Sequence, residues 1–236
     1  MYDEKEDPEH FKFQGDLLPV GDIRDDDRRA VEYHPFVAGK SWLDFGAGYG
    51  WLLERLGPST VDAVGIEASA IQRLKVEAVG YDVYPDIDAL GSRRFDVISM
   101  IHVFEHVTSP ITLLAELGQH LNPGGQIIIE VPHAREIMIN RFASEAFKDF
   151  TFWSEHLLLH TRESLETFVR EAGFSDVSIQ GYQRYPLSNH LHWLARGERG
   201  GHDIWKDLDS PELRAAYAKV LEATDETDSL VAFARI

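Results

Sequence analysis

The residues with the clearest chemical potential form a glycine-rich turn after an apolar run. The acid Asp44 ends the run. Three glycines then follow at every second position, Gly46, Gly48 and Gly50. Glycine adopts the positive φ angles of tight turns, and it lets the backbone approach a ligand because it has no Cβ. The pattern therefore predicts a small-molecule pocket where a buried strand turns into a helix.

The spacing of the glycines separates two kinds of nucleotide ligand. The pyrophosphate-binding pattern G-x-G-x-x-G would need a glycine where the chain has Trp51. The observed D-x-G-x-G-x-G fits a nucleoside without a pyrophosphate better. A second apolar run, Val61 to Ile66, ends in Glu67. An acid about twenty residues after such glycines commonly binds ribose hydroxyls, so Glu67 is expected at a ribose.

Two further segments combine histidine with a carboxylate and could transfer protons. Glu105 and His106 come shortly after a third apolar run, residues 95–101. Glu155 and His156 end a stretch rich in aromatic side chains. A histidine near its ordinary pKa can take a proton from a hydroxyl at neutral pH. We predict that His156 is a general base assisted by Glu155 and His106; the alternative for each pair is a purely structural role.

The elements that must position these residues are strands alternating with helices. Between Ser41 and Val131 this alternation is typical of βαβ units and a parallel sheet. A further helix begins after Thr161 and ends at Gly173. Ser164 stands where a capping box usually has an acid, so this box is predicted to be incomplete. Other helices are expected at 23–37, 51–56, 68–79, 110–121 and 211–223.

A long insertion distinguishes the C-terminal part. The last two predicted strands, 177–179 and 229–234, are separated by Gln183 to Asp228. Long excursions from a compact sheet are usually functional, so we expect a cap over the acceptor. The side chains expected at the substrate are indole or imidazole rings: Trp153, His190, His192 and Trp193.

Composition limits the partners. The chain has 236 residues, no cysteine and a net charge of −17 at pH 7. Such an acidic protein is a poor partner for nucleic acid or anionic membranes, which recruit basic surfaces. The sequence has no apolar run of about 18 residues and no secretory signal in its acidic first residues. We expect a cytoplasmic protein with a small-molecule partner, no nucleic acid and no membrane; the sequence predicts no oligomeric state.

Taken in order, four motifs resemble the class I S-adenosylmethionine-dependent methyltransferases over about residues 40–174. They are the glycine turn, Glu67, Phe95-Asp96-Val97-Ile98 and Leu121-Asn122-Pro123-Gly124-Gly125. The resemblance implies an α/β, Rossmann-like, doubly wound fold. Its seven-stranded sheet would be mostly parallel, with an antiparallel last strand and a cap inserted before it. As a single domain, 1–236 would comprise an N-terminal lid or helix (1–38), a core (39–182), the cap (183–225) and the last strand (226–236).

The resemblance also implies the cofactor, S-adenosyl-L-methionine, and the residues around it. These lie at strand ends: Asp44, Phe45, Gly46, Ala47, Gly48, Glu67, Asp86, Ile87, Ile101 and His102. For Asp86 the alternative is a plain helix cap. A base helps only a protonated nucleophile, so His156 favours O-methylation of a sugar, polysaccharide precursor or secondary metabolite.

Three alternative functions stay open. The segment ending at His156 is similar to the Tyr-His-Glu-His segment of sugar C-methyltransferases, with Trp153 in place of the tyrosine. Some O-methyltransferases of this class hold a divalent ion with Glu-x-x-Glu-His. This chain has His102 where the first Glu belongs, and no metal is predicted. The third alternative is a module that binds the cofactor without catalysis.

Overall fold

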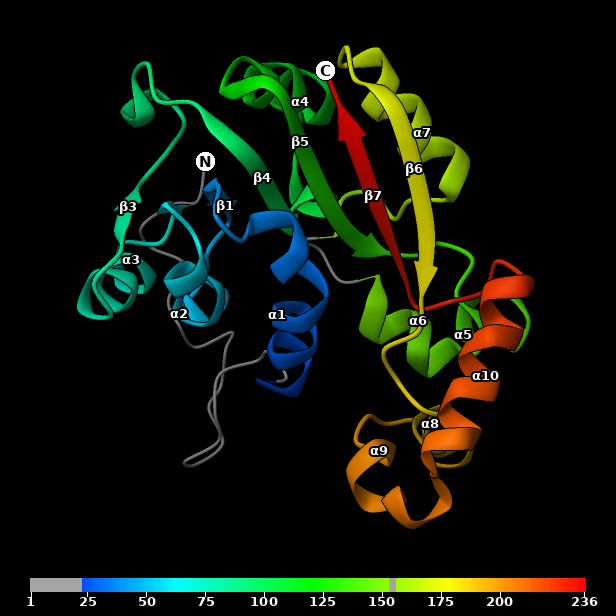
Figure 1. Ribbon diagram of the computed structural model, residues 1–236. Helices are drawn as coiled ribbons and strands as arrows, with labels where there is room; N and C mark the ends of the chain where they lie inside the picture. Colours follow the sequence, from blue (N-terminus) through cyan, green and yellow to red (C-terminus); the bar gives the residue numbers. More distant parts are fainter. Residues whose placement is uncertain (1–22, 153–155) are drawn as a thin grey trace. The chain divides into compact units, whose positions relative to one another are not determined.

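A computed structural model of the chain describes residues 23–152 and 156–236 (Figure 1). Seven strands form one sheet in the order β3-β2-β1-β4-β5-β7-β6. β1 pairs in parallel with β2 and β2 with β3, whereas β7 runs antiparallel to both β5 and β6. This topology confirms the predicted Rossmann-like α/β fold with an antiparallel last strand. The strands are β1 (Ser41–Phe45), β2 (Asp62–Ile66), β3 (Asp82–Tyr84), β4 (Phe95–Ile101), β5 (Leu121–Pro132), β6 (Ser175–Tyr182) and β7 (Ser229–Arg235).

The helices follow the predicted alternation. Those predicted at 23–37, 51–56 and 211–223 have the predicted bounds, and two others are shorter than expected. Among the described residues, none of the helices is both long and apolar enough to cross a membrane. The helices are α1 (Ile23–Val37), α2 (Trp51–Leu56), α3 (Ala70–Ala78), α4 (Pro110–Gln119), α5 (Ile137–Asn140), α6 (Glu145–Thr151), α7 (Arg162–Glu171), α8 (Leu187–Arg196), α9 (Gly201–Ile204) and α10 (Pro211–Ala223).

The chain divides into two compact units. The first contains the described residues up to Ser99, together with His120–Gly125. In β1 of this unit the adjacent residues Trp42 and Leu43 are both 0% exposed. Successive side chains of a strand point to opposite faces, so β1 is covered on both faces, as is usual for a central parallel strand.

The second unit contains Met100–Gln119 and Gln126–Ile236, and it includes the whole insertion. β6 and β7 pair up to Tyr182 and Ser229, where the insertion leaves and returns to the sheet. The insertion folds into α8, α9 and α10, which Figure 1 shows in colours from dark yellow to deep orange. It shares with α5 a buried apolar cluster of Ile137, Met138, Trp193 and Leu221.

The start of α7 corrects one prediction. The Thr161 side chain accepts the backbone N–H of Ser164 at 3.2 Å, and the Ser164 hydroxyl accepts the N–H of Thr161 at 2.9 Å. The capping box is therefore complete, and the predicted incomplete box is wrong. A serine hydroxyl oxygen accepts the returning hydrogen bond as a glutamate would, because the distance across one helical turn is short enough.

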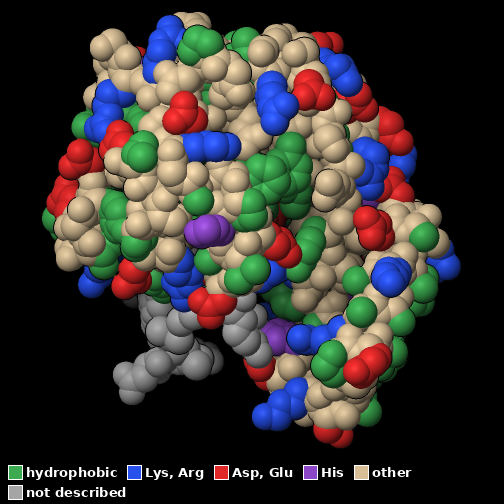
Figure 2. All heavy atoms as spheres, viewed as in Figure 1, with side chains coloured by type: hydrophobic (Ala, Val, Ile, Leu, Met, Phe, Trp, Pro, Cys, Tyr) green, Lys and Arg blue, Asp and Glu red, His purple; other side chains and the backbone are tan. Residues whose placement is uncertain are grey.

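The surface mixes charges of both signs. Figure 2 shows acidic and basic side chains interspersed with apolar ones on the face in view. A basic stripe, which binds a phosphate backbone, is not seen on that face.

Candidate active site

The glycine turn connects β1 to α2 in the first unit. Gly46, Gly48 and Gly50 have φ angles of 81°, 55° and 79°. A side chain is strained at such angles, and a Cβ added to Gly50 would also lie 3.1 Å from Val76 Cγ2. The N–H groups of Gly46 and Ala47 both donate to the carbonyl oxygen of Ile66, at 2.8 and 2.9 Å. The predicted strand–turn–helix is present, and it is fastened to the end of β2.

Glu67 ties this turn to the beginning of α3. Its Oε2 accepts the N–H of Gly48 at 2.9 Å, and its Oε1 accepts the N–H of Ser69 at 2.8 Å. Burial raises the pKa of the Glu67 carboxyl in spite of these bonds. A carboxylate has about four acceptor positions, so both oxygens can still accept from a ligand hydroxyl. The contact of Glu67 with a ribose stays a prediction.

Asp44 is buried at the end of β1, with 4% of its surface exposed. Its Oδ1 accepts a hydrogen bond from the hydroxyl of Ser99 at 2.7 Å. Burial raises the pKa of Asp44 to about 7, although the Ser99 bond acts in the opposite direction. Near neutral pH the carboxyl is thus close to its midpoint, and a cationic ligand would favour the ionised form.

The other predicted cofactor residues have varied surroundings. Phe45 and Ala47 flank Gly46 in the turn. Asp86 is exposed and accepts the N–H of Ala89 at 3.1 Å, as the alternative helix-cap interpretation requires. Ile87 immediately follows it. The structure therefore brings Asp44, the glycine turn and Glu67 together in one unit, whereas the contact of Asp86 and Ile87 with the cofactor stays a prediction.

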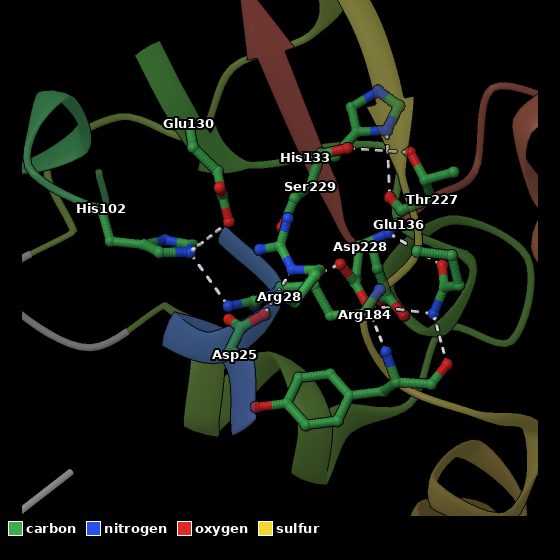
Figure 3. Close-up of polar contacts among 12 residues, drawn as sticks. Asp25, Arg28, His102, Glu130, His133, Glu136, Arg184, Thr227, Asp228 and Ser229 are labelled. Atoms are coloured by element: carbon green, nitrogen blue, oxygen red, sulfur yellow. Dashed lines mark hydrogen bonds and ion pairs between the residues drawn. The ribbon is translucent and has the colours of Figure 1, made fainter. Parts of the chain in front are cut away.

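His102 lies directly after Ile101 at the end of β4, in the second unit, and has a φ of 53°. A positive φ in a non-glycine residue costs free energy and is often found at functional sites. The backbone N–H of His102 donates to the carbonyl oxygen of Glu130 at 2.8 Å. Its Nδ1 lies 3.3 Å from Glu105 Oε1, and its Nε2 lies 3.4 Å from Glu130 Oε1 (Figure 3).

Arg184 also reaches the Nε2 of His102, at 2.9 Å from its Nη1. A guanidinium can only donate, so this contact needs an unprotonated Nε2, whereas the Glu130 contact is strongest when Nε2 carries a proton. Burial and Arg184 lower the pKa of His102, but Glu105 and Glu130 outweigh them and raise it. The two contacts of Nε2 thus belong to different protonation states of the ring.

Glu105 is the carboxylate at the centre of this region, and only 1% of it is exposed. Burial would raise its pKa, but His102, a backbone hydrogen bond and His106 together outweigh burial and lower it. Its backbone carbonyl accepts the N–H groups of Leu157 and Leu158, at 2.9 and 3.3 Å. This fixes the segment that carries His156 next to the 3₁₀ turn Phe104–His106.

His156 and His106 lie side by side, with ring centroids 4.9 Å apart. The Nδ1 of His156 is 2.7 Å from the carbonyl oxygen of Thr151. A carbonyl only accepts, so Nδ1 carries the proton and Nε2 is the basic nitrogen of the neutral ring. Burial lowers the pKa of His156 despite the nearby Glu105. Trp153 and Glu155, which were predicted beside it, lie outside the described residues.

The predicted substrate residues of the insertion are buried. His190 is 1% exposed, with Nδ1 2.6 Å from the Tyr217 hydroxyl. His192 is 3% exposed, with Nδ1 2.9 Å from the carbonyl oxygen of Glu198. Trp193, 5% exposed, belongs to the apolar cluster with α5 and α10. Packing accounts for all three positions, and their contact with a substrate stays a prediction.

No sequence pattern predicted the residues that close the insertion. Asp228 Oδ2 accepts the N–H groups of Arg184 and Tyr185 at 2.9 and 3.0 Å, and the Gln183 side-chain amide at 3.0 Å. Its Oδ1 accepts from the Arg184 Nε at 3.2 Å, and the Asp228 N–H donates to Gln183 Oε1 at 3.1 Å. These bonds join the two ends of the insertion, and Arg184 extends from them to His102 (Figure 3).

The fold and the residues at the strand ends are typical of one class of enzymes, and comparison with known proteins identifies that class. A family model described as a methyltransferase domain matches residues 23–179. The chain therefore belongs to this family of class I methyltransferases: it is an enzyme that uses S-adenosylmethionine.

Named relatives include enzymes with two kinds of acceptor. The chain is 32% identical over 214 residues to a ubiquinone biosynthesis O-methyltransferase from Nitrosococcus oceani, covering 79% of this chain and 88% of that protein. It is 28% identical over 195 residues to a tRNA U34 carboxymethyltransferase from Nautilia profundicola. That match covers 75% of this chain but only 62% of the relative, less than two thirds of its length.

Solved structures confirm the fold. A methyltransferase dependent on S-adenosylmethionine from Archaeoglobus fulgidus matches with a TM-score of 0.64 at 18% identity, covering 92% of this chain and 95% of that one. A phosphoethanolamine N-methyltransferase from Haemonchus contortus, in complex with S-adenosylmethionine, matches with a TM-score of 0.55 at 15% identity. This second match covers 90% of this chain and 52% of that one.

Proposed function

We propose that the enzyme transfers a methyl group from S-adenosylmethionine to a hydroxyl oxygen of a small molecule, with His156 as the general base. The observation that carries this proposal is the Nδ1 of His156, held 2.7 Å from the carbonyl oxygen of Thr151. That bond makes Nε2 the proton acceptor, and the lowered pKa keeps it unprotonated at neutral pH.

The proposed acceptor is a hydroxyl-bearing sugar, polysaccharide precursor or secondary metabolite. Similarity to relatives named for ubiquinone biosynthesis supports an oxygen acceptor and adds an intermediate of that kind to the candidates. The net charge of −17 makes a transfer RNA, as in the name of the other relative, the less favourable choice. The absence of cysteine fits the proposed cytoplasmic setting.

The chemistry asks little of the protein beyond alignment and proton removal. When bound, S-adenosylmethionine would supply a methyl group on a sulfonium sulfur, and S-adenosylhomocysteine would leave as a neutral thioether. His156 Nε2 takes the hydroxyl proton as the oxygen–methyl bond forms and the sulfur–methyl bond breaks. The proposed roles of the glycine turn and Glu67 are to hold the nucleoside, and that of Asp44 is to accept from the amino group.

Activity measurements on the purified full chain test this proposal. S-adenosylmethionine labelled in its methyl group is offered with sugars, sugar nucleotides, phenols and transfer RNA, and the labelled atom of the product is identified. With the best acceptor, His156→Ala should lower kcat about 100-fold or more, with cofactor Kd changed less than about threefold. The exposed His34→Ala is the matched control. An unchanged kcat in His156→Ala would remove the proposed base.

A second candidate, metal-assisted O-methylation, is favoured by one cluster. Glu105, His106 and His156 can each offer one ligand atom, all within 4.8 Å of one another. Glu105 Oε2 is among the buried atoms without a hydrogen-bond partner in the described part of the chain. Two imidazoles and a carboxylate suit a transition-metal ion.

The two candidates exclude each other at His156, because a histidine that binds a metal through Nε2 cannot also take a proton there. Activity that survives a strong chelator would support the base. Activity lost with chelator and restored by added zinc, manganese or cobalt would support the metal.

A further inference from the structure

A hydrogen-bonded chain of three buried side chains ends at Asp44 in the first unit. Trp42, Ser99 and Asp44 are 0%, 2% and 4% exposed. The indole Nε1 of Trp42 donates to Ser99 Oγ at 2.9 Å, and the Ser99 hydroxyl donates to Asp44 Oδ1 at 2.7 Å. Trp42 and Asp44 lie two residues apart on β1, so their side chains share one face of that strand. Ser99 approaches from β4.

The direction of this chain is fixed by chemistry. An indole N–H can only donate, so Ser99 Oγ must accept from Trp42. Ser99 has one hydroxyl proton, and Asp44 Oδ1 at 2.7 Å is a better acceptor than the Leu43 carbonyl oxygen at 3.5 Å. Asp44 Oδ1 is therefore engaged inside the protein, and Oδ2 is the oxygen left to accept from a ligand.

We propose that Ser99, aligned by Trp42, is a positioning residue that holds the Asp44 carboxylate so that Oδ2 accepts a hydrogen bond from the amino group of S-adenosylmethionine. This inference rests on the proposed contact of Asp44 with the cofactor. It adds to that contact the two residues of this chain that set the geometry and the charge of the carboxylate.

The charged surroundings of Asp44 predict how the chain of bonds acts with pH. Burial is the largest influence and raises the pKa of Asp44 to about 7. Ser99 lowers this pKa, Asp26 and Glu67 raise it, and Arg29 lowers it. Removing the Ser99 hydroxyl therefore moves the ionisation of Asp44 to higher pH. Because an ammonium group binds the ionised carboxylate, cofactor affinity should rise with pH through this ionisation.

Calorimetric titration with S-adenosylmethionine between pH 5.5 and 7.5 tests the inference, below the pKa of about 7.7–8.0 of an α-amino group. Ser99→Ala should weaken binding about 5- to 10-fold at pH 7 and shift the rise in affinity to higher pH, since one pKa unit corresponds to about tenfold. Ser99→Thr keeps the hydroxyl and should restore the profile. Trp42→Phe removes the aligning donor and should cost about twofold, the net value of one neutral hydrogen bond being small.

A second readout needs no cofactor. The ¹³C shift of the Asp44 carboxyl in the free protein should titrate at higher pH in Ser99→Ala than in the wild type. Val97→Ala is the matched control, because it trims a buried side chain of the same strand that takes no part in these hydrogen bonds. Like the wild type, it should show an unshifted profile.

The outcomes separate this inference from the function on which it rests. A wild-type protein that binds no S-adenosylmethionine at any pH would overturn both. Wild-type binding with the same Kd, pH profile and Asp44 titration in Ser99→Ala would overturn the positioning role alone. If Ser99→Ala does not fold, an unshifted titration in Trp42→Phe would also overturn it.

Discussion

Two buried carboxyl groups, one in each unit, have pKa values shifted in opposite directions. Asp44 is 4% exposed and Glu105 is 1% exposed. Burial raises the pKa of Asp44 to about 7, where it is opposed mainly by the neutral hydroxyl of Ser99. Glu105 faces an imidazole instead, and His102 brings its pKa below the ordinary value. The chemical nature of the neighbouring side chain, rather than the depth of burial, therefore determines whether the pKa of the carboxyl rises or falls.

The difference lies in the source of the positive charge that would balance each carboxylate. A ligand would supply it beside Asp44, whereas side chains of the protein supply it beside Glu105. In the glycine-turn region the hydrogen-bond donors to Asp44 and Glu67 are backbone N–H groups and a hydroxyl, and Arg29 and Arg73 act on them only as nearby charges. The region around Glu105 contains histidines and Arg184, so its carboxylates already face side chains that can carry a positive charge. We therefore expect Asp44 to matter for ligand binding and Glu105 to matter for folding.

The largest effect should come from Glu105→Gln. Breaking a buried ion pair leaves the partner unmatched and typically costs about 3–5 kcal/mol in the free energy of unfolding. Urea denaturation at pH 7 measures the loss. The exposed Glu116→Gln on α4 is the control and should be nearly neutral. A loss below about 1 kcal/mol for Glu105→Gln would mean that its pairing with His102 is weak.

Asp44→Asn should give the opposite result. Asparagine is neutral and of similar size, so stability at pH 7 should rise, because no charge is buried. Affinity for S-adenosylmethionine should fall about 10- to 100-fold, as expected for losing a hydrogen bond between charged groups. Denaturation and calorimetry are run in parallel, with the exposed Glu54→Gln as control. An Asp44→Asn protein that is unstable but binds normally would reverse the comparison.

The same carboxyl predicts a pH dependence of stability in the absence of cofactor. The ordinary pKa of this carboxyl is 3.8, and in the folded protein it is about 7. Between these values the folded state binds the proton and the unfolded state does not, so stability falls as pH rises. The slope for one proton is about 1.4 kcal/mol per pH unit, and the loss ends above pH 7. The difference between wild type and Asp44→Asn, measured by urea unfolding from pH 5 to 8, should show this slope and flatten above pH 7.

The smallest effect is expected from Arg184→Lys. Lysine cannot donate to Asp228 and His102 at once with the geometry of a guanidinium, so about 1 kcal/mol of stability should be lost. Cofactor affinity should not change. Arg196→Lys, exposed on α8, is the control. A cofactor Kd raised as much as in Asp44→Asn would show that the two regions are not separate in their roles.

The sequence was sufficient for the elements with strong local signals. Apolar runs located most strands, and the helix predicted at 211–223 is α10, where the structure adds the Ser210 cap and Pro211 at the first helical position. α8 was not predicted as a helix, because Pro186 at its N-cap makes no side-chain cap bond. Its buried histidines were instead interpreted as substrate contacts. The short strand β3 carries too few residues for a periodic pattern.

The polar partners of the site were less predictable. Asp44, the glycines and Glu67 lie within short sequence distance and resemble a known pattern. Glu130 sits inside an apolar run, and an acid there is a signal that could have been noticed. Arg184 and His102, by contrast, are 82 residues apart in sequence. The hydrogen bonds that join the two ends of the insertion bring them together, and no local periodicity predicts this contact.

The hydrogen bonds that join the two ends of the insertion also affect how this enzyme could diversify. Asp228 and Gln183 bond the two ends of the insertion, next to the last paired residues Tyr182 and Ser229. Because these ends are already held together, a loop of different length or sequence between them would add little closure entropy. The insertion is thus an exchangeable module: a segment of another length or sequence could replace it while the sheet and the glycine turn stay as they are.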